Sequence, residues 1–208
     1  HTACTRKSPR GDRPDATLDS SPRNVDVDMS QDLQGKRVAI LATHGFEYSE
    51  LTGPRDALRG AGARVEVIAP VKDGAIRGWT GGDWADSVAV DHSLSAANAG
   101  DYDGLVLPGG VLNPDTLRTD AAALDFIRAF AAAGKPIAAI CHGPWLLIDS
   151  GLANGREVTS WPSLRADLGN AGATWRDEPV VVDDGVITSR NPDDVPAFAD
   201  AFARELVE

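Results

Sequence analysis

The sequence predicts an α/β fold in which a mostly parallel sheet lies between helices on both of its faces. Short apolar runs alternate along the chain with helical patterns, which is the arrangement of parallel β/α units. The runs are rich in β-branched residues, as strands buried on both faces are. Polar or glycine-rich segments follow three of them (THGFE, LPGG and CHGP), and ligands bind open parallel sheets at such carboxyl ends. We therefore expect a site there.

The first half of the domain is predicted as two buried strands with a helix between them, followed by a hairpin. The strands are expected over Arg37 to Ala42 and over Ala63 to Pro70. Ser49 can cap the intervening helix, which ends at a pair of glycines. Residues 74–94 combine four glycines with the alternating run SVAVDHSL, and this pattern predicts a hairpin-like excursion.

The second half continues the alternation of strands and helices. In chain order we expect a strand over Gly104 to Gly110, a helix over Thr116 to Ala133, a strand over Pro136 to Cys141, a helix over Gly143 to Ser150, and short strands in EVTSW, PVVV and VITS. The final helix is predicted to begin at Asn191, with Pro192 at its first position. Asp193 and Asp194 follow in its first turn, where acids suit the positive end of the helix dipole.

Residues 1–35 differ in composition from residues 36–208, so we expect a flexible N-terminal leader and one α/β domain. The leader is rich in Pro, Ser, Asp and Arg and has few large aliphatics, so it buries too little apolar surface to fold alone. It also lacks the continuous apolar region of a secretory signal. The alternative is an arm that becomes ordered by packing on the body or on a partner subunit.

Composition excludes several classes of function. The net charge of −11 argues against a groove for nucleic acid, and no apolar run approaches the ~20 residues of a membrane span. We find no dinucleotide fingerprint, phosphate loop or metal constellation, so we expect no cofactor and no metal. Cys4 lies in the leader and Cys141 in the domain. A single cysteine in the domain fits a reducing compartment and predicts a cytoplasmic protein.

Cys141 is the strongest candidate for a reactive group. An apolar strand runs into it, and Gly143 and Pro144 begin a helix immediately afterwards. This is the pattern of a nucleophile elbow, where the reactive side chain projects from a strained turn. The N–H groups of a helix start favour a thiolate, which is the form that attacks carbonyl carbon or peroxide. The alternative is a buried core cysteine without a catalytic role.

The order of histidines excludes two related enzyme classes. The chain has histidines only at positions 1, 44, 92 and 142, and none follows Cys141 by more than one residue. Class I glutamine amidotransferases and α/β-hydrolases both need a histidine well downstream of the nucleophile. His142 is therefore the histidine that sequence places near the thiol, as a proton carrier, a substrate contact or a residue of the sheet rim.

Two side chains of THGFE are candidates for the same site. Glu47 follows the first strand, and a desolvated carboxyl there would have a raised pKa and could donate a hydrogen bond to the thiolate. The alternative for Glu47 is a carboxylate bound by the amides of a helix start. His44 is a candidate substrate contact at the same rim.

The remaining candidates lie at other strand ends. Gly109 and Gly110 of LPGG allow a ligand to approach the backbone, and one of their N–H groups, with that of His142, could form an oxyanion hole. Trp161 and Arg190 are candidate pocket residues. Asp115 follows the glycine turn and is, from the sequence alone, an exposed acid or a helix cap.

The segments THGFE, LVLPGG, GKPIAAICHGPWLL and TSRNPDDVPAF together resemble the PfpI family, within the superfamily of the parkinsonism-associated deglycase. The resemblance covers residues 36 to 208. It implies a flavodoxin-like three-layer sandwich with Cys141 as nucleophile, Glu47 protonated beside it and His142 paired with it. It further implies dimers or larger rings, in which Asp115 reaches the histidine of a neighbouring subunit. Asp115 stands where some members have glutamate, and the shorter side chain puts that reach in question.

The resemblance implies several activities that share one thiol chemistry. We expect a stress-protective, cofactor-free cysteine hydrolase or lyase that acts on α-oxoaldehydes or on glycated adducts, as a glyoxalase or deglycase does. One alternative is an intracellular cysteine peptidase. Another is a redox sensor or chaperone-like stress protein without turnover, which needs only an exposed, low-pKa thiol that peroxide oxidises.

Overall fold

The computed structural model describes residues 31–71 and 74–208. Most of the predicted leader therefore lies outside the described residues, and the division at residue 35 stays a prediction. Within the described part, Leu33 is fully buried, and its N–H donates to the carbonyl of Ala61. The chain thus contributes to the core from just before the first strand.

A seven-stranded sheet forms the centre of the fold, in the order β11-β12-β8-β7-β1-β3-β6. Its strands are β1 (Arg37–Leu41), β3 (Arg64–Ala69), β6 (His92–Ser93), β7 (Gly104–Leu107), β8 (Ile137–Ile140), β11 (Val180–Asp183) and β12 (Val186–Ser189). All pairs are parallel except β11 with β12. This confirms the predicted mostly parallel sheet.

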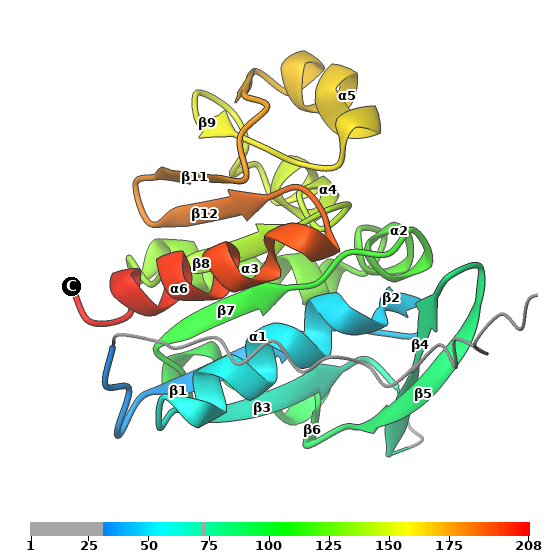
Figure 1. Cartoon of the computed structure of the whole chain (residues 1–208), viewed down its shortest axis with the longest axis vertical. Helices are drawn as coiled ribbons and strands as arrows, with labels where there is room; N and C mark the ends of the chain where they lie inside the picture. Colours follow the sequence, from blue (N-terminus) through cyan, green and yellow to red (C-terminus); the bar gives the residue numbers. More distant parts are fainter. Residues whose placement is uncertain (1–30, 72–73) are drawn as a thin grey trace, which may run out of the picture.

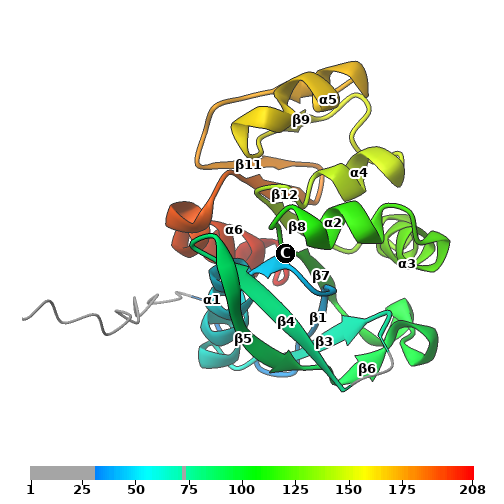
Figure 2. The ribbon, with the colours of Figure 1, turned by 90° about the vertical axis from the view of Figure 1, so that its right-hand side faces the viewer.

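Helices cover both faces of this sheet (Figures 1 and 2). The helices are α1 (Tyr48–Gly60), α2 (Leu112–Leu117), α3 (Ala121–Ala132), α4 (Trp145–Asp149), α5 (Arg165–Asn170) and α6 (Val195–Glu205). In β1, Val38 and Ile40 pack with α1 and α6, whereas Ala39 and Leu41 pack with α2, α3 and α4. Successive side chains of a strand point to opposite faces, so fully apolar strands fill two cores at once. The predicted three-layer sandwich is confirmed.

Two small sheets lie outside the central one. The first joins β2 (Phe46–Glu47), β4 (Ala75–Thr80) and β5 (Asp83–Ala89), and the second pairs β9 (Glu157–Val158) with β10 (Thr174–Trp175). The antiparallel pairing of β4 with β5 confirms the predicted hairpin. Short 3₁₀ turns occur at Leu94–Ala96, Ala99–Asp101, Pro162–Leu164 and Pro192–Asp194. None of the helices in the described ranges has the length and apolarity that a membrane crossing requires.

The predicted helix over Thr116 to Ala133 is wrong as a single element. Two helices occupy this region, because Asp120 caps a new one: its carboxylate accepts the N–H groups of Ala122 and Ala123. Capping satisfies N–H groups that would otherwise lack partners, so an aspartate inside an alanine-rich run can restart a helix. Ser49 does not cap α1, which already begins at Tyr48.

The ends of the last helices follow the sequence more closely. Asn191 accepts a hydrogen bond from the N–H of Asp193, as expected for a cap, and a 3₁₀ turn leads into α6. The helix after Cys141 is shorter than predicted, since α4 spans only Trp145–Asp149.

Candidate active site

Three segments from the carboxyl ends of β1, β7 and β8 meet at one edge of the sheet. The N–H of Glu47 donates to the carbonyl of Gly109 at 3.3 Å. A Cβ added at Gly110 would lie 2.4 Å from the carbonyl oxygen of Gly45, and one at Gly109 would lie 2.6 Å from the Cβ of Cys141. These close approaches leave no room for side chains at the glycine turn. The predicted convergence of THGFE, LPGG and CHGP is confirmed.

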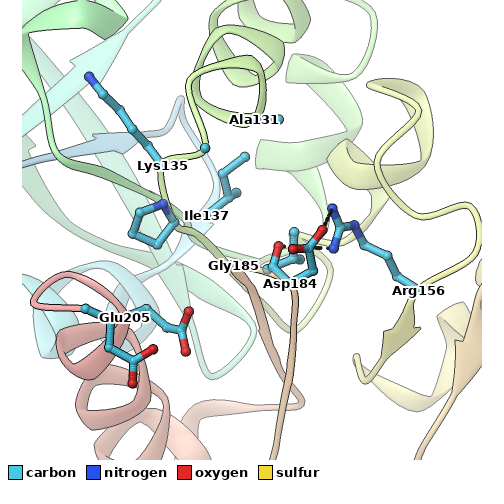
Figure 3. A pocket seen from close by; sticks show the side chains of 11 residues that line it. Ala131, Lys135, Ile137, Arg156, Asp184, Gly185 and Glu205 are labelled. Carbon is cyan, nitrogen blue, oxygen red and sulfur yellow. Dashed lines mark hydrogen bonds and ion pairs between the residues drawn. The ribbon is translucent and has the colours of Figure 1, made fainter.

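A cavity of about 260 Å³ opens at this edge. It is lined by Glu47, Glu50, Trp79, Gly110, Val111, Cys141, His142, Trp161 and Pro192. A larger cavity, about 330 Å³, lies at the opposite edge, where β8 and β12 begin (Figure 3). Its lining has no cysteine or histidine, and Arg156 there is held by Asp184. The smaller cavity is therefore the candidate active site.

Cys141 occupies a strained turn directly after β8. Its φ of 62° lies in the left-handed region, which costs free energy for a residue with a side chain. Hydrogen bonds over-determine this conformation: the Cys141 N–H donates to Ser189 at 3.0 Å, and its carbonyl accepts from Trp161 at 2.9 Å. A Cβ at Gly143 would lie 2.5 Å from the Leu107 carbonyl, so the chain can turn here only with glycine. The geometry matches the predicted elbow.

Glu50, rather than Glu47, is the carboxyl beside the thiol. It lies in the first turn of α1 and is fully buried. Its Oε2 accepts the N–H of Gly109 at 3.0 Å, and its side chain interacts with Cys141. Oε1 has no hydrogen-bond partner of regular geometry among the described residues. Burial raises the pKa of Glu50 to about 8, so the carboxyl is neutral at pH 7.

The helical pattern of α1 predicts that Glu50 is buried, which its distance from the end of β1 does not. The buried side of α1 consists of Glu50, Leu51, Pro54 and Leu58, which is one helical stripe. A carboxyl on this apolar stripe points at the sheet, whereas Glu47 precedes the helix. Helical periodicity therefore identifies Glu50 as the buried acid, whereas closeness to the strand end points to Glu47 instead.

Glu47 lines the same cavity at a half-buried position. Burial raises its pKa, whereas hydrogen bonds from Thr80, Ser49 and the Tyr48 amide oppose the rise. Ser49 Oγ lies 3.5 Å from Glu47 Oε1. The carboxylate is thus held by donors of its own, and the direct interaction with the thiol belongs to Glu50.

The Cys141 thiol is buried rather than exposed. Its residue is 6% exposed, and burial raises its pKa, as does the charge of Glu50 when that carboxyl is ionised. The N–H groups of Gly110 and His142 act in the opposite direction. The expectation of an exposed, low-pKa thiol is therefore wrong for this chain, and the thiol needs a base to become a nucleophile.

His142 is placed to be that base. Its Nδ1 lies 3.2 Å from Cys141 Sγ. Burial lowers the pKa of His142, which keeps the ring neutral and able to accept a proton. The ring is held between two indoles, edge-on to Trp145 at 5.2 Å and stacked on Trp161 at 6.0 Å. The side chains of Cys141 and His142 are adjacent in sequence, yet they point toward one another because the positive φ of Cys141 turns the chain sharply.

Some of the other predicted site residues lie at the cavity and some do not. Gly110 and Trp161 line the cavity, and Gly109 lies directly behind the thiol. His44 is exposed and outside the lining, and its Nδ1 accepts the N–H of Arg77. Arg190 is also outside the lining, because Asp194 and Asp177 hold its guanidinium. Within the chain, Asp115 is exposed on α2 and lies away from the cavity.

Gly109→Ala is expected to destabilise the fold by about 2–4 kcal/mol. The added methyl would lie 2.5 Å from Glu50 Oε2 and 2.8 Å from the Ile140 carbonyl, and neither position can yield freely. Urea unfolding of the variant measures the loss. Gly60→Ala is the matched control, since a Cβ there meets nothing within 4 Å and should cost nothing. Equal stability of the two variants would contradict the close packing described at the thiol.

Comparison with known proteins places the chain in a family. A family model described as DJ-1/PfpI family matches residues 36–205. The chain belongs to the DJ-1/PfpI family. The sequence resemblance to PfpI proteins is thereby confirmed for nearly the whole described domain.

Curated proteins from two bacteria are similar to this chain over most of its length. General stress protein 18 of Bacillus subtilis is 44% identical over 165 residues, which are 79% of this chain and 94% of that protein. Protein/nucleic acid deglycase 2 of Escherichia coli is 43% identical over 164 residues, 78% of this chain and 93% of the relative. YraA of B. subtilis, named as a candidate cysteine protease, is 42% identical over 163 residues, with 78% and 94% covered.

Solved structures of DJ-1/PfpI proteins share the fold. DJ-1beta of Drosophila melanogaster has a TM-score of 0.76 and 32% identity, over 82% of this chain and 90% of that chain. A two-domain protein of Anabaena variabilis, with DJ-1/ThiJ/PfpI-like and ferritin-like domains, has a TM-score of 0.78 and 35% identity. The match covers 83% of this chain and about half (48%) of the Anabaena chain.

The described part of this DJ-1/PfpI chain offers no metal site. No group of three or more His, Cys, Asp and Glu side chains in residues 31–71 and 74–208 could hold a metal ion. The groups that can do chemistry at the cavity are the thiol, the imidazole, the two carboxyls and the backbone amides.

Proposed function

We propose that this DJ-1/PfpI protein is a stress-protective cysteine enzyme that acts on α-oxoaldehydes or on their early glycated adducts, as a glyoxalase or deglycase. The arrangement of three groups carries the proposal: the Cys141 thiol, a neutral imidazole 3.2 Å away and the buried acid Glu50. Similarity to a general stress protein and to a deglycase of proteins and nucleic acids supports the same class of activity.

The first step is addition of the thiol to the aldehyde carbon of a substrate such as methylglyoxal. His142 Nδ1 takes the thiol proton as the bond between Sγ and carbon forms, and the carbonyl π electrons move to oxygen. The N–H groups of Gly110 and His142, which face the sulfur, stabilise that oxyanion until it is protonated. The N–H of Gly109 donates to Glu50. Of the two glycines predicted as donors to the oxyanion, Gly110 is therefore the one that can act together with His142.

The second step converts the hemithioacetal into a thioester. A proton leaves the former aldehyde carbon and another is added to the neighbouring carbonyl carbon, with an enediol between the two states. Water then hydrolyses the thioester, which releases lactate and regenerates the thiol, so that methylglyoxal and water give lactate. Neutral Glu50 assists because its carboxyl can donate a hydrogen bond to sulfur without repelling a thiolate. The chemistry requires no metal and no cofactor.

A substrate panel tests this proposal. Methylglyoxal, glyoxal and an unstructured protein such as casein are incubated with the wild-type protein and with Cys141→Ser. We expect loss of the two dicarbonyls with the wild type only, and no cleavage of casein. If the wild type leaves both dicarbonyls unchanged, the glyoxalase assignment is wrong.

A cysteine peptidase is the second candidate, and the similarity to YraA favours it. The same thiol, base and oxyanion donors would serve amide hydrolysis. The cavity of about 260 Å³ suits a small carbonyl compound better than an extended peptide. Casein cleavage by the wild type that is lost in Cys141→Ser would make the peptidase the better assignment. Selective peroxide oxidation of Cys141 without turnover would favour the redox sensor.

We also propose that the protein works as a homo-oligomer in the cytoplasm. Within one chain the described residues leave His142 without a carboxylate partner for its second ring nitrogen, and the family resemblance assigns that role to Asp115 of a neighbouring subunit. Val111 and Leu112 are exposed at the start of α2, the helix that carries Asp115, and a second copy there would cover them. A free cysteine in the domain fits a reducing compartment. Light scattering of the purified protein measures the oligomeric state.

A further inference from the structure

The lining of the candidate active-site cavity is acidic. Among the described residues that line it, two are carboxyls, Glu47 and Glu50, and none is Lys or Arg. Its walls are otherwise apolar, with Trp79, Val111 and Trp161 around the thiol. A charge at the mouth of an apolar cavity acts over a longer range than one on the open surface, because less water screens it.

Glu47 is the carboxyl of this lining that several hydrogen-bond donors bind. Its carboxylate faces the Thr80 and Ser49 hydroxyls and the amides of Ser49 and Tyr48. Burial raises the pKa of Glu47, and these four donors oppose that rise because they favour the ionised form. Glu50, in contrast, is fully buried and has a single regular hydrogen bond, from Gly109. The two carboxyls of the cavity therefore differ in their surroundings: Glu50 is fully buried beside the sulfur, whereas Glu47 is half-buried and bound by donors that favour a carboxylate.

Arg190 is a cation close in sequence to the lining, but two carboxylates hold it and it does not line the cavity. Arg190 follows β12, the strand next to β8, and Pro192 two residues later lines the cavity. Its guanidinium is nevertheless held by Asp194 at 2.9 Å and by Asp177 at 2.9 Å. A freely placed arginine here would attract carboxylate substrates, and these two ion pairs prevent it.

We propose that Glu47 determines substrate charge at this site: it admits uncharged α-oxoaldehydes and excludes α-oxo acids, whose carboxylate would lie beside its own. Charge, rather than size, then separates methylglyoxal or glyoxal from glyoxylate or pyruvate, which are molecules of similar dimensions. The substrate class rests on the proposed function, whereas the charge selection can be measured without any turnover.

Two alkylating reagents of nearly equal size test the charge selection. Iodoacetamide is neutral and iodoacetate is an anion, and both transfer a two-carbon group to a thiol with loss of iodide. Their rates at Cys141 are measured at pH 7 by mass spectrometry of its peptide and divided by their rates with mercaptoethanol. We expect the wild type to prefer iodoacetamide by about tenfold, and Glu47→Gln to reduce that preference about fivefold. Raising the salt to 1 M should reduce the wild-type preference in the same direction.

The matched control is Glu205→Gln, which removes a partly buried carboxylate at the cavity on the opposite edge of the sheet (Figure 3). It changes the net charge equally, so its preference should equal that of the wild type. The inference is overturned if Glu47→Gln prefers iodoacetamide as strongly as the wild type does. It is also overturned if the ratio of the iodoacetamide rate to the iodoacetate rate is the same for wild-type Cys141 as for mercaptoethanol.

Inhibition by glyoxylate gives a second measurement: glyoxylate should inhibit methylglyoxal consumption only in Glu47→Gln. If no variant consumes methylglyoxal but the alkylation preference depends on Glu47, the proposed function fails and the charge selection stands.

Discussion

Replacing Cys141 by alanine is expected to lower the rate of methylglyoxal consumption by at least about a thousandfold. In the proposed mechanism sulfur is the atom that forms the bond to the substrate, and among the described residues that line the cavity no other side chain is a thiol. The fold should persist, because the change removes one small buried atom and costs about 1 kcal/mol or less. Circular dichroism and thermal unfolding check the fold, and the rate of methylglyoxal loss gives the activity.

Cys141→Ser is the conservative control for this prediction. It keeps the size of the side chain and its hydrogen-bonding capacity, but a hydroxyl is a far weaker acid than a thiol. We expect it to be nearly as inactive as the alanine variant. If either variant consumed methylglyoxal at the wild-type rate, the reaction would have to occur elsewhere in the protein.

The free energy of unfolding is expected to fall as the pH rises and Glu50 ionises. Burial raises its pKa from 4.5 to about 8 in the folded state, so between these values the folded protein holds a proton that the unfolded chain has lost. The stabilisation is therefore complete below pH ~4.5 and is lost as pH rises through about 8. Each pKa unit corresponds to about 1.4 kcal/mol, and we expect a loss of roughly 2–4 kcal/mol.

Glu50→Gln isolates this contribution. The amide retains the size of the side chain and can still accept the Gly109 N–H, but it cannot ionise. Urea unfolding between pH 5 and pH 8.5 should show a clearly flatter pH dependence in this variant than in the wild type. Glu157→Gln, at a half-exposed side chain, is the control and should follow the wild type. Parallel curves for Glu50→Gln and the wild type would mean that Glu50 ionises normally.

The central sheet could be predicted because each of its strands is specified locally. The runs VAIL (residues 38–41) and IAAI (residues 137–140) are apolar at every position, as is typical of strands buried on both faces. The hairpin was equally local, since glycines and alternation mark it. The break between α2 and α3 was missed because alanine-rich sequence favours a continuous helix, and only the capping geometry of Asp120 shows the restart.

The candidate site was predicted well where the backbone determines it. The elbow at Cys141 follows from a strand, a glycine and a helix start in immediate succession. Glu50 was missed because its direction depends on the rotation of α1 against the sheet, which strand-end reasoning does not include. The position of Arg190 near a strand end predicts a pocket residue, yet Asp177, from a different segment, binds its guanidinium outside the cavity lining. Such tertiary ion pairs have no local signature.

The proposed chemistry depends most on a neutral Glu50 beside Cys141, and carboxyl carbon NMR measures the protonation state of this side chain directly. Protein labelled at the glutamate carboxyl carbon is titrated from pH 4 to pH 10, with Glu50→Gln to assign the resonance. We predict one glutamate with a midpoint near pH 8 in the wild type and none there in Glu50→Gln. A Glu50 resonance that titrates near the ordinary pKa of 4.5 would show that this carboxyl is ionised at neutral pH.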